Sequence, residues 1–358
     1  MKKITIAMVC MLAIAGCKQK GQTDADASLA DSLRADSLMA DSVYAEAAKL
    51  TPEDIEVDWA NKEITVQNGG KQPDIVTLLK AFHKAWPTDV LADLLDMASD
   101  PKFTRSTNGE TGGAVTVDRK NGFVEFIHGD APGDNVTAAM WNRKDGNRLL
   151  IINIVRPGRE VGVNTVQALC AYDYEPNSQT LRPERNAVVR FRQSADMTTT
   201  YTLPRDGKDI SIVERDNDFR GTYHIFTWDG QNFSKESTIS EEHLTKALNG
   251  KWTTCEADKP QLTFTITNND ETYCGITDCN AEGTTDYEAA ANVYDGFLHL
   301  YEASAPDETN FDPSINCKFR LLKDGRLRGT YFLRLDTGQE VQGEMTLQKE
   351  SELSQYSE

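Results

Sequence analysis

Residues 136–155, VTAAMWNRKDGNRLLIINIV, form the stretch that decides how most of this chain folds. Two apolar runs, 136–141 and 149–155, flank the turn residues Lys144, Asp145 and Gly146. Apolar runs joined by an Asp-Gly turn are typical of a β-hairpin. The stretch therefore predicts two antiparallel strands.

The same pattern continues on both sides of this hairpin. Residues 114–117 and 123–127 flank a turn at 119–122. Further strand-like runs follow at 163–174, 188–191, 201–203, 210–213 and 223–228. An Asp229-Gly230 turn closes the series. Short runs separated by turn signals predict an antiparallel sheet.

Two amphipathic helices are predicted before this sheet. After Pro73, apolar residues recur at spacings of three and four, at Ile75, Leu78, Leu79, Phe82 and Trp86. Thr88 is placed to cap a second helix, which carries Val90, Leu91, Leu94 and Leu95. Ahead of both helices, the alternation of Ile55, Val57 and Trp59, followed by Ile64 and Val66, predicts a β-hairpin. A helix pair on one face of an antiparallel sheet indicates an α+β domain over residues 55–236.

An all-β domain is predicted over residues 240–350. A short helix at 240–249, capped by Ser240, leads to Gly250-Lys251-Trp252. Eight strand-like segments follow, at 252–256, 262–267, 273–276, 287–293, 297–301, 317–322, 329–335 and 341–347. We expect them to close into an eight-stranded up-and-down barrel, because closure removes exposed strand edges.

A short helix feeding Gly-x-Trp and then a strand meander resembles the start of a lipocalin barrel. The resemblance implies a lumen for a small apolar ligand. The arginine that usually stacks on this tryptophan has no clear counterpart, because Arg334 lies one strand too early.

The N-terminus carries an export signal. Lys2 and Lys3 precede an apolar run over residues 4–15, and small residues then lead into Cys17. This pattern resembles a bacterial lipoprotein signal, which implies that residues 1–16 are removed and that Cys17 is lipidated. An ordinary secretory signal and a transmembrane helix are the alternatives, but the run is shorter than the roughly 20 residues that span a bilayer.

Residues 17–54 are predicted to form a flexible spacer. They are rich in Ala, Asp and Ser, and a five-residue repeat leaves no apolar stripe on a helix. Three tripeptides within the repeat, 31–33, 36–38 and 41–43, resemble the Asp-Ser/Thr-aliphatic acceptor of O-glycosylation in Bacteroidetes. The resemblance implies sugars on Ser32, Ser37 and Ser42.

A series of short motifs also resembles uncharacterised Bacteroidetes lipoproteins, a resemblance that brings no known activity. The motifs are Trp141, Leu150-Ile151-Ile152, Tyr172-Asp173-Tyr174, Tyr201-Thr202-Leu203-Pro204 and Trp228-Asp229-Gly230. The resemblance implies an outer-membrane lipoprotein of the cell envelope. Such proteins tend to carry acidic residues after the lipidated cysteine when they are sent to the outer surface. Residues 18–22 (KQKGQ) depart from that pattern, so the periplasmic face is expected.

The charge of the chain excludes one class of partner. Its formal net charge is −18, without a basic block. Nucleic acid is therefore not an expected partner, because its binding depends on phosphate neutralisation. Anionic headgroups would repel the chain as well, so membrane attachment must come from the N-terminal lipid.

Five cysteines remain after residue 17. Cys255, Cys274, Cys279 and Cys317 are predicted to form disulfide bonds in the oxidising envelope, with the pairing left open. The alternative is a four-cysteine metal site, which is disfavoured because only Cys274 and Cys279 are close in sequence. Cys170 is expected to be a buried free thiol. No metal and no cofactor are predicted.

No known catalytic motif is present in the sequence. His83, His128, His224, His243 and His299 are scattered along the chain. His128-Gly129-Asp130 is the place where a functional histidine would be sought first, because Asp130 could orient His128 on a loop. The acidic loop at 305–312 lacks the spacing of a calcium loop, so a solvated loop is favoured. No catalytic residue is therefore predicted.

The sequence favours a lipid-anchored envelope protein that binds or scaffolds, with a small apolar ligand in the barrel or an envelope protein as its partner. The alternative is an envelope hydrolase acting on glycan or ester substrates, with His128 or a carboxylate pair transferring protons. A purely structural partner protein is a third hypothesis.

Overall fold

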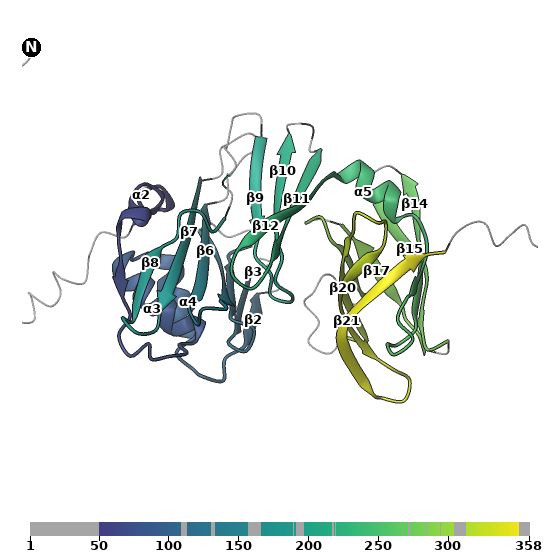
Figure 1. Ribbon diagram of the computed structural model, residues 1–358, viewed down its shortest axis with the longest axis horizontal. Coiled ribbons are helices and arrows are strands. Elements are labelled where there is room, and N and C mark those ends of the chain that lie inside the picture. Colours follow the sequence, from purple (N-terminus) through teal and green to yellow (C-terminus); the bar gives the residue numbers. More distant parts are fainter. Residues whose placement is uncertain are drawn as a thin grey trace, which may run out of the picture. The chain divides into compact units, whose positions relative to one another are not determined.

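The computed structural model describes residues 50–108, 113–129, 133–156, 166–188, 190, 197–216, 218, 220–270, 273–283, 285–293, 295–303 and 313–350. All of them belong to the compact unit Lys49–Glu358. The described chain is mostly antiparallel β-sheet with four α-helices (Figure 1). Cys17, Ser32, Ser37 and Ser42 lie outside the described residues, so their predicted modifications stay predictions.

Sheet A contains the hairpin predicted over residues 136–155. Its strands lie in the order β1-β8-β7-β6-β5-β4-β3-β2, a meander to which β1 adds at one edge. Their bounds are β1 (Ile64–Thr65), β2 (Arg105–Asn108), β3 (Gly113–Asp118), β4 (Phe123–Ile127), β5 (Asn135–Asn142), β6 (Arg148–Arg156), β7 (Val166–Glu175) and β8 (Thr180–Pro183). Gly146, in the turn between β5 and β6, has a φ of 91°, which a residue without Cβ adopts readily.

The predicted helix pair is confirmed as α3 (Ile75–Ala85) and α4 (Asp89–Met97). Asp74 caps α3 by accepting a hydrogen bond from the backbone N–H of Thr77 at 2.8 Å. Thr88 caps α4 by accepting from the N–H of Leu91 at 3.4 Å. Each cap satisfies a backbone donor that has no partner within its helix.

The β-hairpin predicted from Ile55, Val57 and Trp59 is wrong. The segment is helix α2 (Pro52–Asp58), continued by the 3₁₀ turn η2 (Trp59–Asn61). Thr51 and Asp54 form a capping box with proline in the first turn, a strong local start signal. Ile55 and Trp59 are therefore one helical turn apart and buried, whereas Val57 is 75% exposed.

These helices cover one face of sheet A (Figure 1). Tyr172 in β7 connects the layers, because its hydroxyl donates to the carbonyl of Trp59 at 3.0 Å and accepts from the indole N–H of Trp86 at 3.2 Å. Its ring also meets Phe82 edge-on, with centroids 5.9 Å apart. A fully buried tyrosine is tolerated here because its hydroxyl has both a donor and an acceptor as partners.

The opposite face of sheet A packs against a second sheet, which the sequence analysis did not separate from the first. Sheet B has the order β12-β11-β10-β9. Its strands are β9 (Met197–Thr202), β10 (Ile210–Asp216), β11 (Gly221–Trp228) and β12 (Phe233–Ser240). The ring of Trp141 in β5 meets that of Phe233 edge-on, with centroids 5.2 Å apart. Its centroid lies 6.3 Å from that of Trp228. The strand predicted at 188–191 is not one at its described residues 188 and 190.

The eight strands predicted after residue 250 are all present, but the closed barrel is wrong. Helix α5 (Glu241–Leu248), capped by Ser240, leads into a nine-stranded sheet C that is a half-barrel. Its strands are β13 (Gly250–Thr254), β14 (Leu262–Asp270), β15 (Tyr273–Ala281), β16 (Thr285–Asp286), β17 (Ala289–Asn292), β18 (Leu298–Glu302), β19 (Ile315–Leu321), β20 (Leu327–Arg334) and β21 (Glu340–Lys349). The two outermost strands, β16 and β17, have two and four residues, too few to form a closing ladder.

Large apolar side chains pack inside the half-barrel. Trp252, Phe264 and Phe319 are almost completely buried, and the two phenylalanine rings stack with centroids 6.2 Å apart. The indole N–H of Trp252 donates to the carbonyl of Leu248 at 2.8 Å, which ties α5 to the first strand. Among the described residues, no helix is long and apolar enough to cross a membrane.

Sheet B takes part in two hydrophobic cores. Ile212 and Phe226 belong to the core shared with sheet A, whereas Val213 and Tyr223 belong to that of the half-barrel. Alternate residues of a strand point to opposite faces, so both faces of this sheet are used.

Candidate functional site

The first polar cluster joins sheet B to the half-barrel and is centred on Asp295. One carboxylate oxygen of Asp295 lies 2.8 Å from Nε2 of His299, and the other lies 3.1 Å from Nζ of Lys318. The backbone carbonyl of Asp295 accepts a hydrogen bond from the hydroxyl of Ser211 in β10. Asp295, His299 and Ser211 are at most 2% exposed.

The ionisation of Asp295 is set by these contacts. Burial opposes the charged form, but the positive charge of Lys318 and the hydrogen bond from His299 outweigh it and hold the pKa of Asp295 well below its usual range. Ser, His and Asp are all present, but Ser211 bonds to a backbone oxygen rather than to the imidazole. A buried set in this arrangement stabilises a junction and offers no reacting hydroxyl to a substrate.

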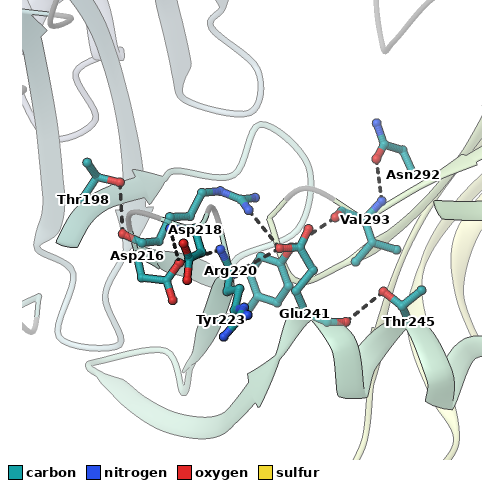
Figure 2. Close-up of polar contacts among 11 residues, drawn as sticks. Thr198, Asp216, Asp218, Arg220, Tyr223, Glu241, Thr245, Asn292 and Val293 are labelled. Atoms are coloured by element: carbon teal, nitrogen blue, oxygen red, sulfur yellow. Dashed lines mark hydrogen bonds and ion pairs between the residues drawn. The ribbon is translucent and has the colours of Figure 1, made fainter. Parts of the chain in front are cut away.

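A second cluster lies at the same junction (Figure 2). Arg215 donates to a carboxylate oxygen of Glu241 at 2.9 Å, and Glu241 also accepts from the backbone N–H of Gly221 at 3.2 Å. The hydroxyl of Tyr223 donates to the carbonyl of Val293 at 3.2 Å. Burial and the nearby Glu241 carboxylate raise the pKa of Tyr223, so the hydroxyl stays protonated and can donate.

The third cluster lies on the face of sheet B that is turned towards sheet A. Nε2 of His224 in β11 lies 2.7 Å from a carboxylate oxygen of Glu214 in β10, and Nδ1 lies 3.0 Å from the hydroxyl of Thr238 in β12. The imidazole is buried, whereas Thr238 is exposed. A hydroxyl, an imidazole and a carboxylate are thereby connected in that order, an arrangement that can move a proton away from the hydroxyl. We call Glu214, His224 and Thr238 the sheet B relay.

The predicted pair of His128 and Asp130 is described only at His128. Its backbone N–H donates to the side chain of Asn135 at 2.9 Å, and its ring packs 4.9 Å from that of Phe126. Asp130, the predicted partner, lies outside the described residues, as does the acidic loop 305–312. Desolvation lowers the pKa of His83, whose Nδ1 accepts from the N–H of Thr88 at 3.5 Å.

The cysteines are free thiols throughout the described chain. Cys170 is buried in sheet A, as expected. Cys255 is exposed, whereas Cys274, Cys279 and Cys317 are buried in the half-barrel core, where desolvation raises the pKa of Cys274 to about 11 and that of Cys279 to about 12. Disulfide bonds among these four stay a prediction for the exported chain. Within the described residues, no three His, Cys, Asp or Glu side chains gather as metal ligands.

Sequence reasoning missed both histidine–carboxylate pairs. Counting back from the Asp229-Gly230 turn would have placed His224 opposite residue 237 or 238, since the two strands of a hairpin pair around their turn. Asp295 and His299 likewise flank the turn at Gly296. No protein-family model matches the chain, and none of the curated proteins is significantly similar to it.

Proposed function

We propose that this chain is a lipid-anchored cell-envelope protein whose β-rich part binds or scaffolds a partner. The observation that carries the proposal is the use of buried charge at the junction. The junction between sheet B and the half-barrel contains the cluster of Asp295, Lys318 and His299. It also contains an ion pair of 2.9 Å between Arg320 and Asp209. Such groups can fix the relative geometry of the two sheets, and Asp295 and His299 are buried away from any substrate.

Anchoring is supported by the signal pattern that ends at Cys17 and by the repeat-rich spacer that follows it. The test is expression of the whole chain and of Cys17→Ser in a bacterial host fed with an alkyne-tagged fatty acid. The label and membrane fractionation are expected for the natural sequence, and both are expected to be lost in the variant. Labelling that persists in Cys17→Ser would contradict lipidation at this residue.

Periplasmic placement at the outer membrane is supported by the KQKGQ sequence after Cys17. Protease added to intact cells is expected to leave the chain whole, and protease added to permeabilised cells is expected to cut it. Cutting in intact cells would place it on the outer surface instead. The same cells, treated with a cross-linker before lysis, would identify an envelope partner.

A small apolar ligand in the half-barrel is the more specific form of the binding proposal. It is supported by the apolar interior of the half-barrel, whose core includes Trp252, Phe264 and Phe319. These side chains are buried against one another, so a ligand would need to pack among them. Native mass spectrometry of the chain purified from its host would reveal a bound molecule, and a bare mass would restrict the half-barrel to a structural role.

The second candidate function is hydrolysis of ester or glycan substrates in the envelope. The sheet B relay favours esters, because a hydroxyl bound to an imidazole is the arrangement that acyl transfer requires. A panel of ester, phosphate and glycoside substrates separates the two functions. No turnover of any of them would leave binding or scaffolding as the function.

A further inference from the structure

We propose that Thr238 is the nucleophile of an acyl-transfer site for esters, with His224 as its general base and Glu214 as the residue that positions the imidazole. The inference rests on the geometry of the sheet B relay. It rests on the second candidate function above, ester hydrolysis, for which it names the reacting residues, and it is independent of the lipid anchor.

Strand register brings the three residues together from neighbouring strands, with His224 10 positions from Glu214 and 14 from Thr238. His224 of β11 pairs directly with Thr238 of β12, and a β-bulge at Ile225/Phe226 sets that register. Directly opposite residues share one face of an antiparallel sheet, so the imidazole and the hydroxyl point to the same side. Glu214 lies on the other side of His224 and reaches Nε2 at 2.7 Å.

The hydrogen bonds fix the tautomer that acyl transfer needs. Because a carboxylate only accepts, the 2.7 Å contact with Glu214 requires an N–H on Nε2. In the neutral imidazole Nδ1 is then the acceptor for the Thr238 hydroxyl, 3.0 Å away. The carboxylate then also stabilises the imidazolium that forms, as in hydroxyl–imidazole–carboxylate triads generally.

Burial is distributed as a nucleophilic site requires. His224 is 6% exposed, so bulk water does not compete for its contacts with Glu214 and Thr238. Thr238 is an exposed residue, so an ester can reach it from solvent. The Asp295–His299 pair has the first property without the second, because every one of its groups is buried.

Donors for the developing oxyanion come from the strand edge. Among the described strands, β12 pairs only with β11 and is the outer strand of sheet B. In an antiparallel pair, alternate backbone N–H groups of the outer strand point away from its neighbour. Such N–H groups beside Thr238 are available to stabilise a tetrahedral intermediate.

The face of sheet B that carries the relay also holds a buried hydroxyl without a hydrogen-bond partner among the described residues. Thr199 of β9 lies directly opposite Glu214 and is 5% exposed, and its buried hydroxyl has no hydrogen-bond partner among the described residues. A buried hydroxyl without a partner is costly, so its presence beside the relay points to a polar group that binds there.

The reaction balances with water as the only co-substrate. The Thr238 oxygen attacks the ester carbonyl carbon while its proton moves to Nδ1 of His224. The ester C–O bond then breaks, His224 returns the proton to the leaving alkoxide, and an alcohol departs from acyl-Thr238. Water, deprotonated by His224, attacks the acyl carbon and releases a carboxylic acid and the free Thr238 hydroxyl.

The test incubates the full chain, purified in detergent, with p-nitrophenyl acetate. We expect p-nitrophenol to be released and one acetyl group to become attached to each chain. Peptide mass mapping should locate this acetyl group at Thr238. Thr238→Val should abolish this acetylation, and Thr238→Ser should retain acetylation at position 238. His224→Gln should slow acetylation by about 100-fold or more, the usual contribution of a general base.

The matched control is Thr200→Val, which removes an exposed threonine from β9, on the opposite face of sheet B. Acetylation at Thr238 should proceed in it as in the unchanged chain. Thermal unfolding of every variant confirms that it is folded. A folded chain that is never acetylated at Thr238, or one acetylated equally fast in His224→Gln, would overturn the proposal and reduce the relay to a structural hydrogen-bond cluster.

Discussion

Two histidine–carboxylate pairs in this protein have nearly the same geometry and different surroundings. Nε2 of His299 lies 2.8 Å from Asp295, and Nε2 of His224 lies 2.7 Å from Glu214. The first pair is sealed between sheet B and the half-barrel beside Lys318, whereas the second leads to the exposed hydroxyl of Thr238. The comparison shows that surroundings, more than the pair itself, separate a structural element from a candidate reactive site.

The largest expected change in the free energy of unfolding comes from breaking the buried Asp295–His299 pair. Asp295→Ala should lower the free energy of unfolding by about 3–5 kcal/mol, because Lys318 and His299 would remain in the junction without their counter-charge. Glu214→Ala is the matched variant and should cost about 1 kcal/mol or less, since the Glu214 side chain is partly exposed. Urea unfolding of both variants measures the difference, and equal losses would remove the distinction between the pairs.

The pH dependence of stability sharpens the same comparison. The folded-state pKa of Asp295 lies below its unfolded value, so its contribution is complete above the unfolded pKa of about 3.9 and is lost as pH falls below it. Unfolding of the unchanged chain should therefore become easier below about pH 4. In Asp295→Asn this part of the acid sensitivity should disappear. Parallel pH profiles for the two proteins would contradict the assignment.

Tyr223→Phe tests the junction through a neutral hydrogen bond. Losing the hydroxyl leaves the carbonyl of Val293 without this donor and should cost about 1–1.5 kcal/mol. Tyr287→Phe is the control, because the Tyr287 hydroxyl is buried without a hydrogen-bond partner among the described residues. Its removal should leave stability unchanged or raise it. Equal thermal shifts for the two variants would show that the Tyr223 contact carries no stability.

The smallest effect is expected at the exposed end of the second pair. Thr238→Val should change the free energy of unfolding by about 0.5–1 kcal/mol, the net value of one partly solvated hydrogen bond. Chemical denaturation measures it. A loss several times larger would mean that the sheet B relay is a stability element, as the Asp295 cluster is.

Local signals carried the correct part of the sequence prediction. The helix pair followed from apolar residues at helical spacing and from the Thr88 cap, and all eight strands after residue 250 were found between their turns. The segment at 55–59 was misread because alternation over three apolar residues also fits one turn of helix, and the Thr51–Asp54 capping box decided for the helix. No local signal in the sequence showed that strands β1–β8 and strands β9–β12 belong to two different sheets.

The sequence by itself determined the helix pair and most of the strands, because turn residues, caps and apolar periodicity act over a few neighbours. It also determined the acidic charge and the N-terminal signal pattern. Only the tertiary structure decided that the half-barrel stays open and which histidine meets which carboxylate. Those outcomes depend on strand register and on packing between residues far apart in the chain, where a shift of one position turns every side chain to the other face.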